Sequence, residues 1–309
     1  MSGTDSDRAA HLEQRDRLFA AGLLVPTGTE GLYGRSGVFE DIVSALERLV
    51  LSAGADQDAN IVRFPPVISR SAFEKSDYLR SFPNLTGSVH TFRGDDRDHQ
   101  QLLRLLESGG DWTAALVSAD TALCPAACHP LYATIKGPMP AKGRRWNVYG
   151  YVFRYEPSVD PARLLAFRQY EYVLVGEPDQ AVAHRDTWLQ RAVGLLGELG
   201  LDVVAEVAND PFFGRAGRML AANQREENLK YEVLAPTSGA ATLTAIASAN
   251  CHEDHFGAAF SILTETGVAA HSACVGFGVE RITLALLWAH GLDPERWPAS
   301  LKHRLWSAR

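Results

Sequence analysis

The chain has 309 residues, and its 30 lysines and arginines stand against 37 aspartates and glutamates, a formal net charge of −7 at pH 7. The length allows one large domain with a substantial core, and the acidic balance argues against a protein that wraps a nucleic-acid backbone such as tRNA. The charged N-terminus lacks a signal-peptide core and no apolar run reaches membrane-spanning length, which predicts a cytoplasmic protein without membrane attachment.

Four segments have helical periodicity, and six have strand-like apolar or alternating patterns. The helical segments are Val38–Leu51, Asp98–Leu106, Arg185–Leu199 and Ile282–Ala289. The strand-like segments are Ala114–Val117, Val148–Tyr155, Glu171–Val175, Val203–Val207, Leu243–Ala249 and Ala258–Leu263. Strands joined by long excursions, with helices at intervals, predict an α+β fold in which an antiparallel sheet is flanked by helices.

The segment from Tyr151 to Gly176 reads as two apolar strands around a short polar loop. That loop holds Arg154, Glu156 and Arg163. Charged groups of both signs between two buried strands indicate a candidate binding site.

A glycine-rich strand end meets an amphipathic helix in the segment from Gly276 to His290, with Arg281 at the junction. Gly276 and Gly278 allow the backbone to approach a ligand closely, and the arginine can meet a nucleotide phosphate. Taken alone, the pattern is also typical of a packing device.

Cys124, Cys128, Cys251 and Cys274 are the four cysteines. In a cytosolic chain they predict thiols or metal ligands rather than disulfides, and each can also be a small buried apolar residue. The densest donor run is Cys251-His252-Glu253-Asp254-His255. Adjacent residues project in different directions and rarely converge on one ion, so we do not favour this run as the metal site.

Taken together, three segments resemble the signature motifs of class II aminoacyl-tRNA synthetases. The second and third motifs are matched by Phe153-Arg154-x-Glu156, with Phe167 downstream, and by Gly-x-Gly-x-Glu280-Arg281. The first is matched by GVFEDIVSALERLV from Gly37 to Val50 and by the FPP and SFP runs that follow, which look like that family's dimer-forming helix and strand. The resemblance implies the class II fold and a homodimer.

Further segments resemble the amino acid:[carrier protein] ligases, which are truncated relatives of the atypical zinc-dependent seryl-tRNA synthetases. They are PAACHPLYA around Cys128, FRQYEYVLVG around Glu171, DPFFGRAGR from Asp210, and ANCHEDHFG through HSACVGFGVER. The similarity extends from about Gly31 to Trp288. We therefore expect an N-terminal extension (1–30) and a catalytic domain (31–309) without a separate tRNA-binding domain.

By this resemblance, Cys128, Glu171 and Cys274 hold a zinc ion and come together from three distant strands. Three protein ligands leave zinc an open position, which in the related synthetases takes the neutral α-amino group of the substrate. Cys124 lies nearby in sequence, but only Cys128 has the PAAC-x-P-x-Y context of the family. His129 stands where family members have an aromatic residue.

The resemblance also assigns an ATP site. Arg154 is expected to hold the α-phosphate and the substrate carboxylate, and Arg281 the γ-phosphate or the adenine face. Glu156 would contact the adenine amino group and Phe167 would stack beneath the ring, although a structural salt bridge between Arg154 and Glu156 is the alternative. The expected catalytic residues are Arg154 and Arg281, and the expected ATP-binding set is Arg154, Glu156, Phe167, Gly278, Glu280 and Arg281.

Magnesium is expected to bridge the phosphates, with Glu232 and Ser248 as candidate ligands. Asp210 is a candidate contact to the substrate amino group, or a turn-forming residue before proline. The implied reaction is ATP-dependent activation of a small amino acid as an aminoacyl-adenylate, then transfer to the phosphopantetheine thiol of a small carrier protein. Glycine is the expected substrate, with alanine or a glycine analogue next. The alternatives are tRNA aminoacylation with a partner, and a non-catalytic paralogue that binds a nucleotide or amino acid.

Overall fold

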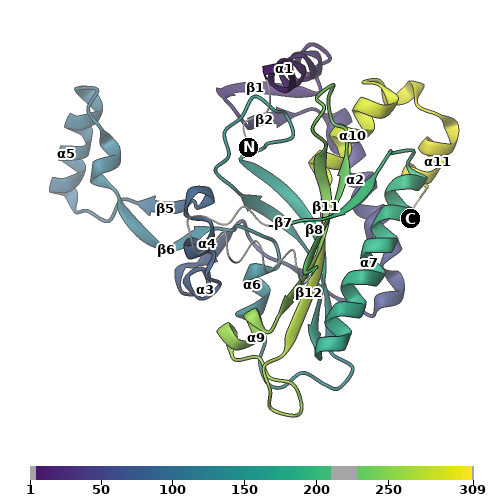
Figure 1. The fold of residues 1–309 in the computed structure, drawn as a ribbon. Helices are drawn as coiled ribbons and strands as arrows, with labels where there is room; N and C mark the ends of the chain where they lie inside the picture. The colour runs from purple at the N-terminus through teal and green to yellow at the C-terminus, as the bar shows by residue number, and fades with distance from the viewer. Residues whose placement is uncertain (1–4, 210–227, 308–309) are drawn as a thin grey trace.

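The centre of the structure, a computed structural model that describes residues 5–209 and 228–307, is a seven-stranded sheet (Figure 1). Its strand order is β3-β7-β8-β12-β11-β10-β9. β3 runs parallel to β7, and the other neighbouring strands are antiparallel. The strands are β3 (Asn60–Arg63), β7 (Arg144–Phe153), β8 (Ala166–Gly176), β9 (Val204–Val207), β10 (Lys230–Ala235), β11 (Thr244–Glu253) and β12 (His271–Gly278).

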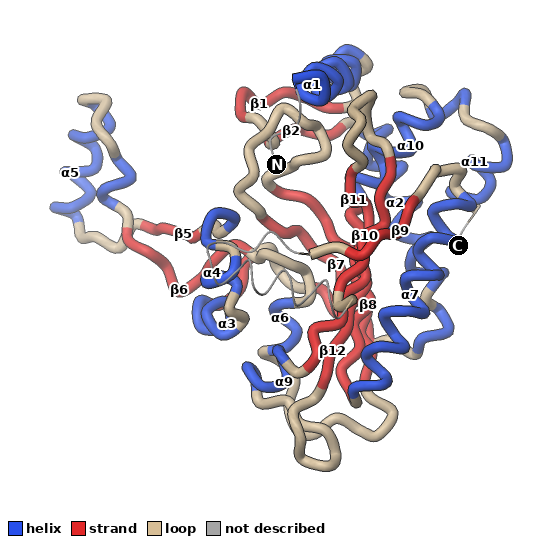
Figure 2. Tube along the Cα trace, viewed as in Figure 1, coloured by secondary structure: helices blue, strands red, loops and turns tan. Residues whose placement is uncertain are grey.

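Helices cover one face of this sheet (Figures 1 and 2). They are α2 (Gly37–Ala53), α7 (Pro178–Glu198), α10 (Val279–His290) and α11 (Ala299–Trp306). Side chains alternate along a strand, so Tyr170 and Tyr172 of β8 join the helix-side core while Glu171 faces the other way. Within residues 5–209 and 228–307, no helix combines the length and apolar character needed to cross a membrane.

The opposite face carries a second apolar cluster beneath two short helices, α6 (His129–Tyr132) and α9 (His255–Phe260). Val148 of β7 and Val173 of β8 belong to it. Tyr132 stacks on Phe256 with 4.0 Å between the ring centroids, which fixes α6 against α9. Since α6 follows Cys128 directly, this contact also fixes where Cys128 lies over the sheet.

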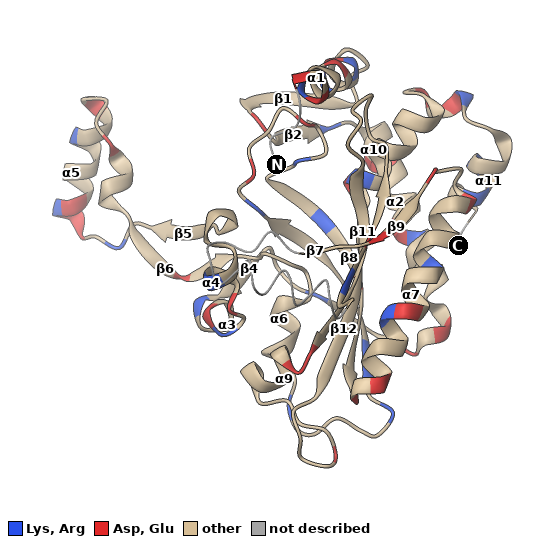
Figure 3. Ribbon diagram, in the orientation of Figure 1, with Lys and Arg blue, Asp and Glu red and all other residues tan. Residues whose placement is uncertain are grey.

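A smaller three-stranded sheet lies beside the main one and bears an arm (Figure 1). It consists of β4 (Val67–Ser69), β5 (Ser88–Thr91) and β6 (Val117–Leu123), next to α3 (Arg70–Lys75) and α4 (Tyr78–Ser81). α5 (Asp96–Glu107), between β5 and β6, projects from the body (Figure 1), and the ribbon in Figure 3 marks acidic and basic residues interspersed along it.

The N-terminal residues pack as part of the main core. α1 (Asp5–Ala20) is followed by the hairpin of β1 (Leu24–Thr29) and β2 (Leu32–Arg35). Leu18, Leu23 and Leu24 belong to the helix-side core. The expected boundary between residues 30 and 31 falls in the turn of this hairpin.

The four predicted helices correspond to α2, α5, α7 and α10, with shifted ends. α2 begins after Ser36, whose side chain caps the Phe39 amide. α7 begins well before Arg185, because Pro178 occupies its first turn and Glu177 and Gln180 form a capping box.

Four predicted strands correspond to β7, β8, β9 and β11, and two predictions are wrong. Most of Ala258–Leu263 lies at the end of α9 and in the turn after it, because a short apolar run does not distinguish a buried strand from a buried helix. Ala114 and Ala115 end a short 3-10 helix (Trp112–Ala115) that Asp111 caps at the Thr113 amide, and β6 begins only at Val117.

Candidate active site

Two cysteines and a glutamate converge on the sheet face beneath α6. The ligand atoms of Cys128, Glu171 and Cys274 all lie within 4.8 Å of one another, and all three residues are buried. Glu171 comes from β8 and Cys274 from the neighbouring β12, where alternation puts both on the same face. Cys128 lies just before α6 rather than on a strand, so the expectation of three strands is wrong in this respect.

The chemistry of this trio fits a metal ion. The Oε2 atom of Glu171 is buried and has no hydrogen-bond partner within the described part of the chain. Burial, together with the neighbouring Cys274, raises the pKa of Glu171 to about 8. Two thiols and a carboxylate suit zinc, and a bound cation would relieve the cost of enclosing three acidic groups together.

Two side chains from β11 approach the Cys274 sulfur. His252 Nε2 lies 3.6 Å from Cys274 Sγ, and the Asn250 amide donates to the same sulfur at 3.7 Å. Cys251, between them, packs in a separate apolar cluster with Leu174, so the dense donor run divides between the two faces. Because side chains alternate along a strand, Asn250 and His252 lie on the same face of β11. This alternation was visible in the sequence, but the sequence analysis did not predict that both side chains approach Cys274.

Next to the trio, two arginines face one aromatic ring. The guanidinium carbons of Arg154 and Arg281 lie 5.6 and 5.5 Å from the centroid of the Phe167 ring. Burial and the nearby charges of Arg163 and Arg154 lower the pKa of Arg281 to about 10. This concentration of positive charge favours an anionic ligand.

Glu156 does not pair with Arg154, so the structural salt bridge between them is absent. Glu156 instead accepts from Arg163 at 3.1 Å, whereas Arg154 Nε donates to the Pro125 carbonyl at 3.3 Å. Arg154 therefore keeps much of its hydrogen-bonding capacity for a ligand. The adenine contacts expected of Glu156 and Phe167 stay predictions.

Glu280 lies beneath the site in a buried ion-pair network. It is 0% exposed, and its Oε1 accepts from Arg168 Nε at 2.7 Å and lies 3.3 Å from Arg35 Nη1. Arg168 also donates to Glu40 at 2.7 and 2.9 Å, which ties β8 and α10 to α2. This geometry gives Glu280 a supporting place next to Arg281, and its expected contact with ATP stays a prediction.

We predict that Glu280→Gln lowers the free energy of unfolding by about 3 kcal/mol, because it leaves buried cations without one of their carboxylates. This loss is at the lower end of the roughly 3–5 kcal/mol that removing one partner of a buried ion pair costs, because Glu40 still faces Arg168. Urea denaturation measures the change. Glu198→Gln, which removes the surface pair with Arg304, is the matched control and should change stability by less than about 1 kcal/mol. Equal effects of the two variants would contradict the structural importance of the network.

The strand register places the candidate magnesium ligands, Ser248 and Glu232, in the same row across the sheet as Glu171 of the trio. Glu171, Gly276, Ser248 and Glu232 are successive cross-strand partners on β8, β12, β11 and β10. A Cβ on Gly276 would lie 3.5 Å from Glu171 Oε1, so this glycine leaves room beside the carboxylate. Glu232 is paired with Lys230 at 3.0 Å.

The remaining predicted site residues are Gly278 and Asp210. Gly278 caps the start of α10, where a Cβ would make only ordinary contacts, 3.5 Å or more from Ile246 and Arg281. Its backbone position therefore matters more than its lack of a side chain. Asp210 lies outside the described residues.

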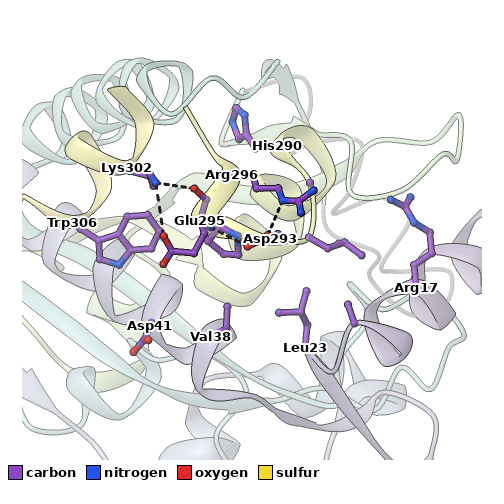
Figure 4. Close-up of a pocket in the computed structure, with 14 residues that line it drawn as sticks. Arg17, Leu23, Val38, Asp41, His290, Asp293, Glu295, Arg296, Lys302 and Trp306 are labelled. Carbon is purple, nitrogen blue, oxygen red and sulfur yellow. Dashed lines mark hydrogen bonds and ion pairs between the residues drawn. The ribbon is translucent and has the colours of Figure 1, made fainter. Parts of the chain in front are cut away.

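The cavity in Figure 4 is separate from this site. It measures about 980 Å³ and lies between α1, the start of α2 and the C-terminal segment. Some of its polar groups already bond to one another: Arg296 pairs with Asp293 at 3.1 Å, and Lys302 donates to the Glu295 carbonyl at 2.8 Å. The predicted site residues are not among those that line it.

The fold is that of class II synthetase catalytic domains. The structure matches the seryl-tRNA synthetase of M. kandleri, solved with the tRNASec of A. aeolicus, at a TM-score of 0.80 and 21% identity, covering 94% of this chain and 60% of that one. It matches the ATP complex of the P. horikoshii enzyme at a TM-score of 0.68 and 17% identity, covering 96% of this chain and 62% of that one. The predicted α+β class II fold is confirmed.

The sequence defines the family more narrowly. The chain is 42% identical over 277 residues to Amino acid--[acyl-carrier-protein] ligase 1 of Bradyrhizobium diazoefficiens, covering 89% of this chain and 85% of the relative, and 41% identical over 280 residues to ligase 2 of that organism, covering 90% and 84%. It is 28% identical to the type-2 serine--tRNA ligase of Methanopyrus kandleri over 59% of this chain and 37% of that one. No protein-family model matches the chain. The chain belongs to the amino acid--[acyl-carrier-protein] ligase family and is a ligase, as its motifs predicted.

Proposed function

We propose that the protein activates a small amino acid with ATP, as an aminoacyl-adenylate, and transfers the aminoacyl group to the phosphopantetheine thiol of a small carrier protein. The observation that carries this proposal is the juxtaposition of the Cys128, Glu171 and Cys274 trio with Arg154 and Arg281 on one face of the sheet. One group of residues suits an amine-binding metal and the other suits phosphates.

The chain's own residues would orient the reactants and balance charge. In the first step, a carboxylate oxygen of the amino acid attacks the α-phosphorus of ATP and pyrophosphate leaves. Arg154 is placed to hold the carboxylate and the α-phosphate, and Arg281 to hold the distal phosphates or the adenine face. In the second step, the carrier thiol loses its proton and attacks the acyl carbon, and AMP leaves.

The metal proposed here is zinc, held by Cys128, Glu171 and Cys274. When bound, it would offer its open position to the neutral α-amino group and so select amino acids over other carboxylates. Magnesium would accompany ATP, with Glu232 and Ser248 as candidate ligands. Glycine is the proposed substrate, followed by alanine or a glycine analogue.

We also propose a homodimer that pairs through α2 and β3. Ile61 of β3 is 61% exposed, and Val38 and Leu51 of α2 are also exposed apolar residues. Val38 lies in the helical segment that resembles the dimer-forming motif of class II synthetases, Leu51 follows it directly, and Ile61 lies just before the FPP run. Burial against a second copy would remove this apolar surface from water.

Amino-acid-dependent exchange of pyrophosphate into ATP tests the activating step, because it needs no acceptor. We expect exchange with glycine or another small amino acid, and its loss when a chelator removes the metal. A carrier protein and tRNA, supplied separately, then distinguish the two acceptors. Silence across all proteinogenic amino acids and glycine analogues, from folded and zinc-loaded protein, would favour the non-catalytic alternative.

A further inference from the structure

The N-terminal helix α1 contacts two loops that lie beside the predicted nucleotide site. His11 Nδ1 lies 3.6 Å from Asp160 Oδ1, in the loop between β7 and β8. The same nitrogen lies 3.0 Å from the hydroxyl of Ser238, in the loop between β10 and β11. One side chain of α1 therefore joins two segments that are distant in the sequence.

Asp7, one turn earlier on α1, holds the second of these loops. Its carboxylate accepts from the Ala241 amide at 3.0 Å and from the Thr242 hydroxyl at 2.6 Å. The hydrogen bond from Thr242 lowers the pKa of Asp7, so the carboxylate is charged at neutral pH. Asp7 is buried, although most of the first turn of α1 is exposed.

The two loops lead to the two backbone acceptors that orient Arg281. Its Nε donates to the Ala162 carbonyl and its Nη1 to the Ala245 carbonyl, both at 3.0 Å. Ala162 is fixed in turn, because its amide donates to Asp160, the residue that His11 contacts. Ala245 is the second residue of β11, the strand that follows the loop held by Asp7.

We propose that α1 is a positioning element of the nucleotide site, in which Asp7 and His11 hold the two loops whose carbonyls orient Arg281. The inference rests on the proposed function, because it assumes that Arg281 contacts ATP. An arginine side chain has many rotamers, and fixing two of its donors in advance reduces what ATP binding must order. Asp7 and His11 act through Arg281 and do not touch the substrate.

The test compares His11→Ala and Asp7→Ala with matched controls on the same helix. The exposed Glu13→Ala and Asp5→Ala change α1 without touching either loop. In pyrophosphate exchange we expect His11→Ala and Asp7→Ala to raise the KM for ATP about tenfold, the effect of losing one or two hydrogen bonds. The KM for the amino acid and the bound zinc should stay within about twofold, because the trio lies just before α6 and on β8 and β12, whereas the contacts of Asp7 and His11 described above reach two other loops.

Two further variants separate positioning from general stability. Ser238→Ala removes one contact of His11 without altering α1, and should raise the KM for ATP in a fully folded protein. His11→Asn retains a side-chain hydrogen-bonding group and should recover part of the lost affinity. An unchanged KM for ATP in folded His11→Ala and Ser238→Ala, or an equal rise in both KM values, would overturn the inference. Wild-type protein that neither binds ATP nor exchanges pyrophosphate would overturn the proposed function as well.

Discussion

Arg154→Ala is expected to lower the rate of amino-acid-dependent pyrophosphate exchange by about 10²–10³-fold, the usual effect of removing one preorganised donor from a charged transition state. The geometry explains this size. Within residues 5–209 and 228–307, no carboxylate forms an ion pair with Arg154, since Glu156 pairs with Arg163 instead. Among the hydrogen-bond acceptors of these residues, Arg154 Nε contacts only the Pro125 carbonyl. Its other donors can therefore meet negative charge that develops during the reaction.

The matched variants of this experiment separate charge from geometry. Arg154→Lys keeps the charge but cannot reproduce paired parallel hydrogen bonds, so it should recover little of the rate. Arg97→Ala removes an arginine from α5, an exposed helix that projects from the body of the protein (Figure 1), and should leave the rate unchanged. An Arg154→Ala protein that is folded and exchanges pyrophosphate at the wild-type rate would exclude Arg154 from the chemistry.

The convergence of the metal trio was predictable because it depends on register. Once Glu171 and Cys274 lie on neighbouring strands, alternation sends both to the same face, and the family motifs supply Cys128. The sequence did not predict that Cys128 precedes a short helix, since PAACHPLYA carries a proline and no helical period long enough to read.

The supporting contacts were not predictable from one sequence. Arg168 reads as a polar break in an apolar strand, and only the fold brings Glu280 and Glu40 to it. The contacts of Asp7 with Ala241 and Thr242 likewise join residues more than 200 positions apart. Such long-range polar contacts leave no periodic signal, so the N-terminal residues read as an extension although they reach the loops of the site.

Two separate sets of contacts thus position Arg281 from different sides. Arg281 follows Glu280 on α10, and the buried network of Glu280 fixes that helix against β8 and α2. The Ala162 and Ala245 carbonyls fix the other end of its side chain. Preorganisation of this kind lowers the reorganisation needed when a charged ligand binds.

Cys128→Ser and Cys274→Ser are each expected to reduce bound zinc from one equivalent per chain to a small fraction, because a serine hydroxyl is a poor replacement for a thiolate. Elemental analysis after dialysis against zinc measures the loss, independently of activity. Exchange activity should fall with the zinc content. Asn250→Ala, which removes the donor to Cys274, should weaken zinc binding by about 10–100-fold without abolishing it.

Cys124 and Cys251 supply the matched controls, since both are also buried free cysteines. The Cys124 thiol donates to the Ala126 carbonyl at 3.1 Å, a bond that Cys124→Ser can keep. Cys251 packs with Leu174 and Ala181 in a cluster apart from the trio, so Cys251→Ala should retain zinc. Loss of zinc from Cys124→Ser with retention in Cys128→Ser would reverse the choice between the two. Full zinc content in all four variants would show that the metal, if bound, lies elsewhere, and the amino group of the substrate would then need another partner.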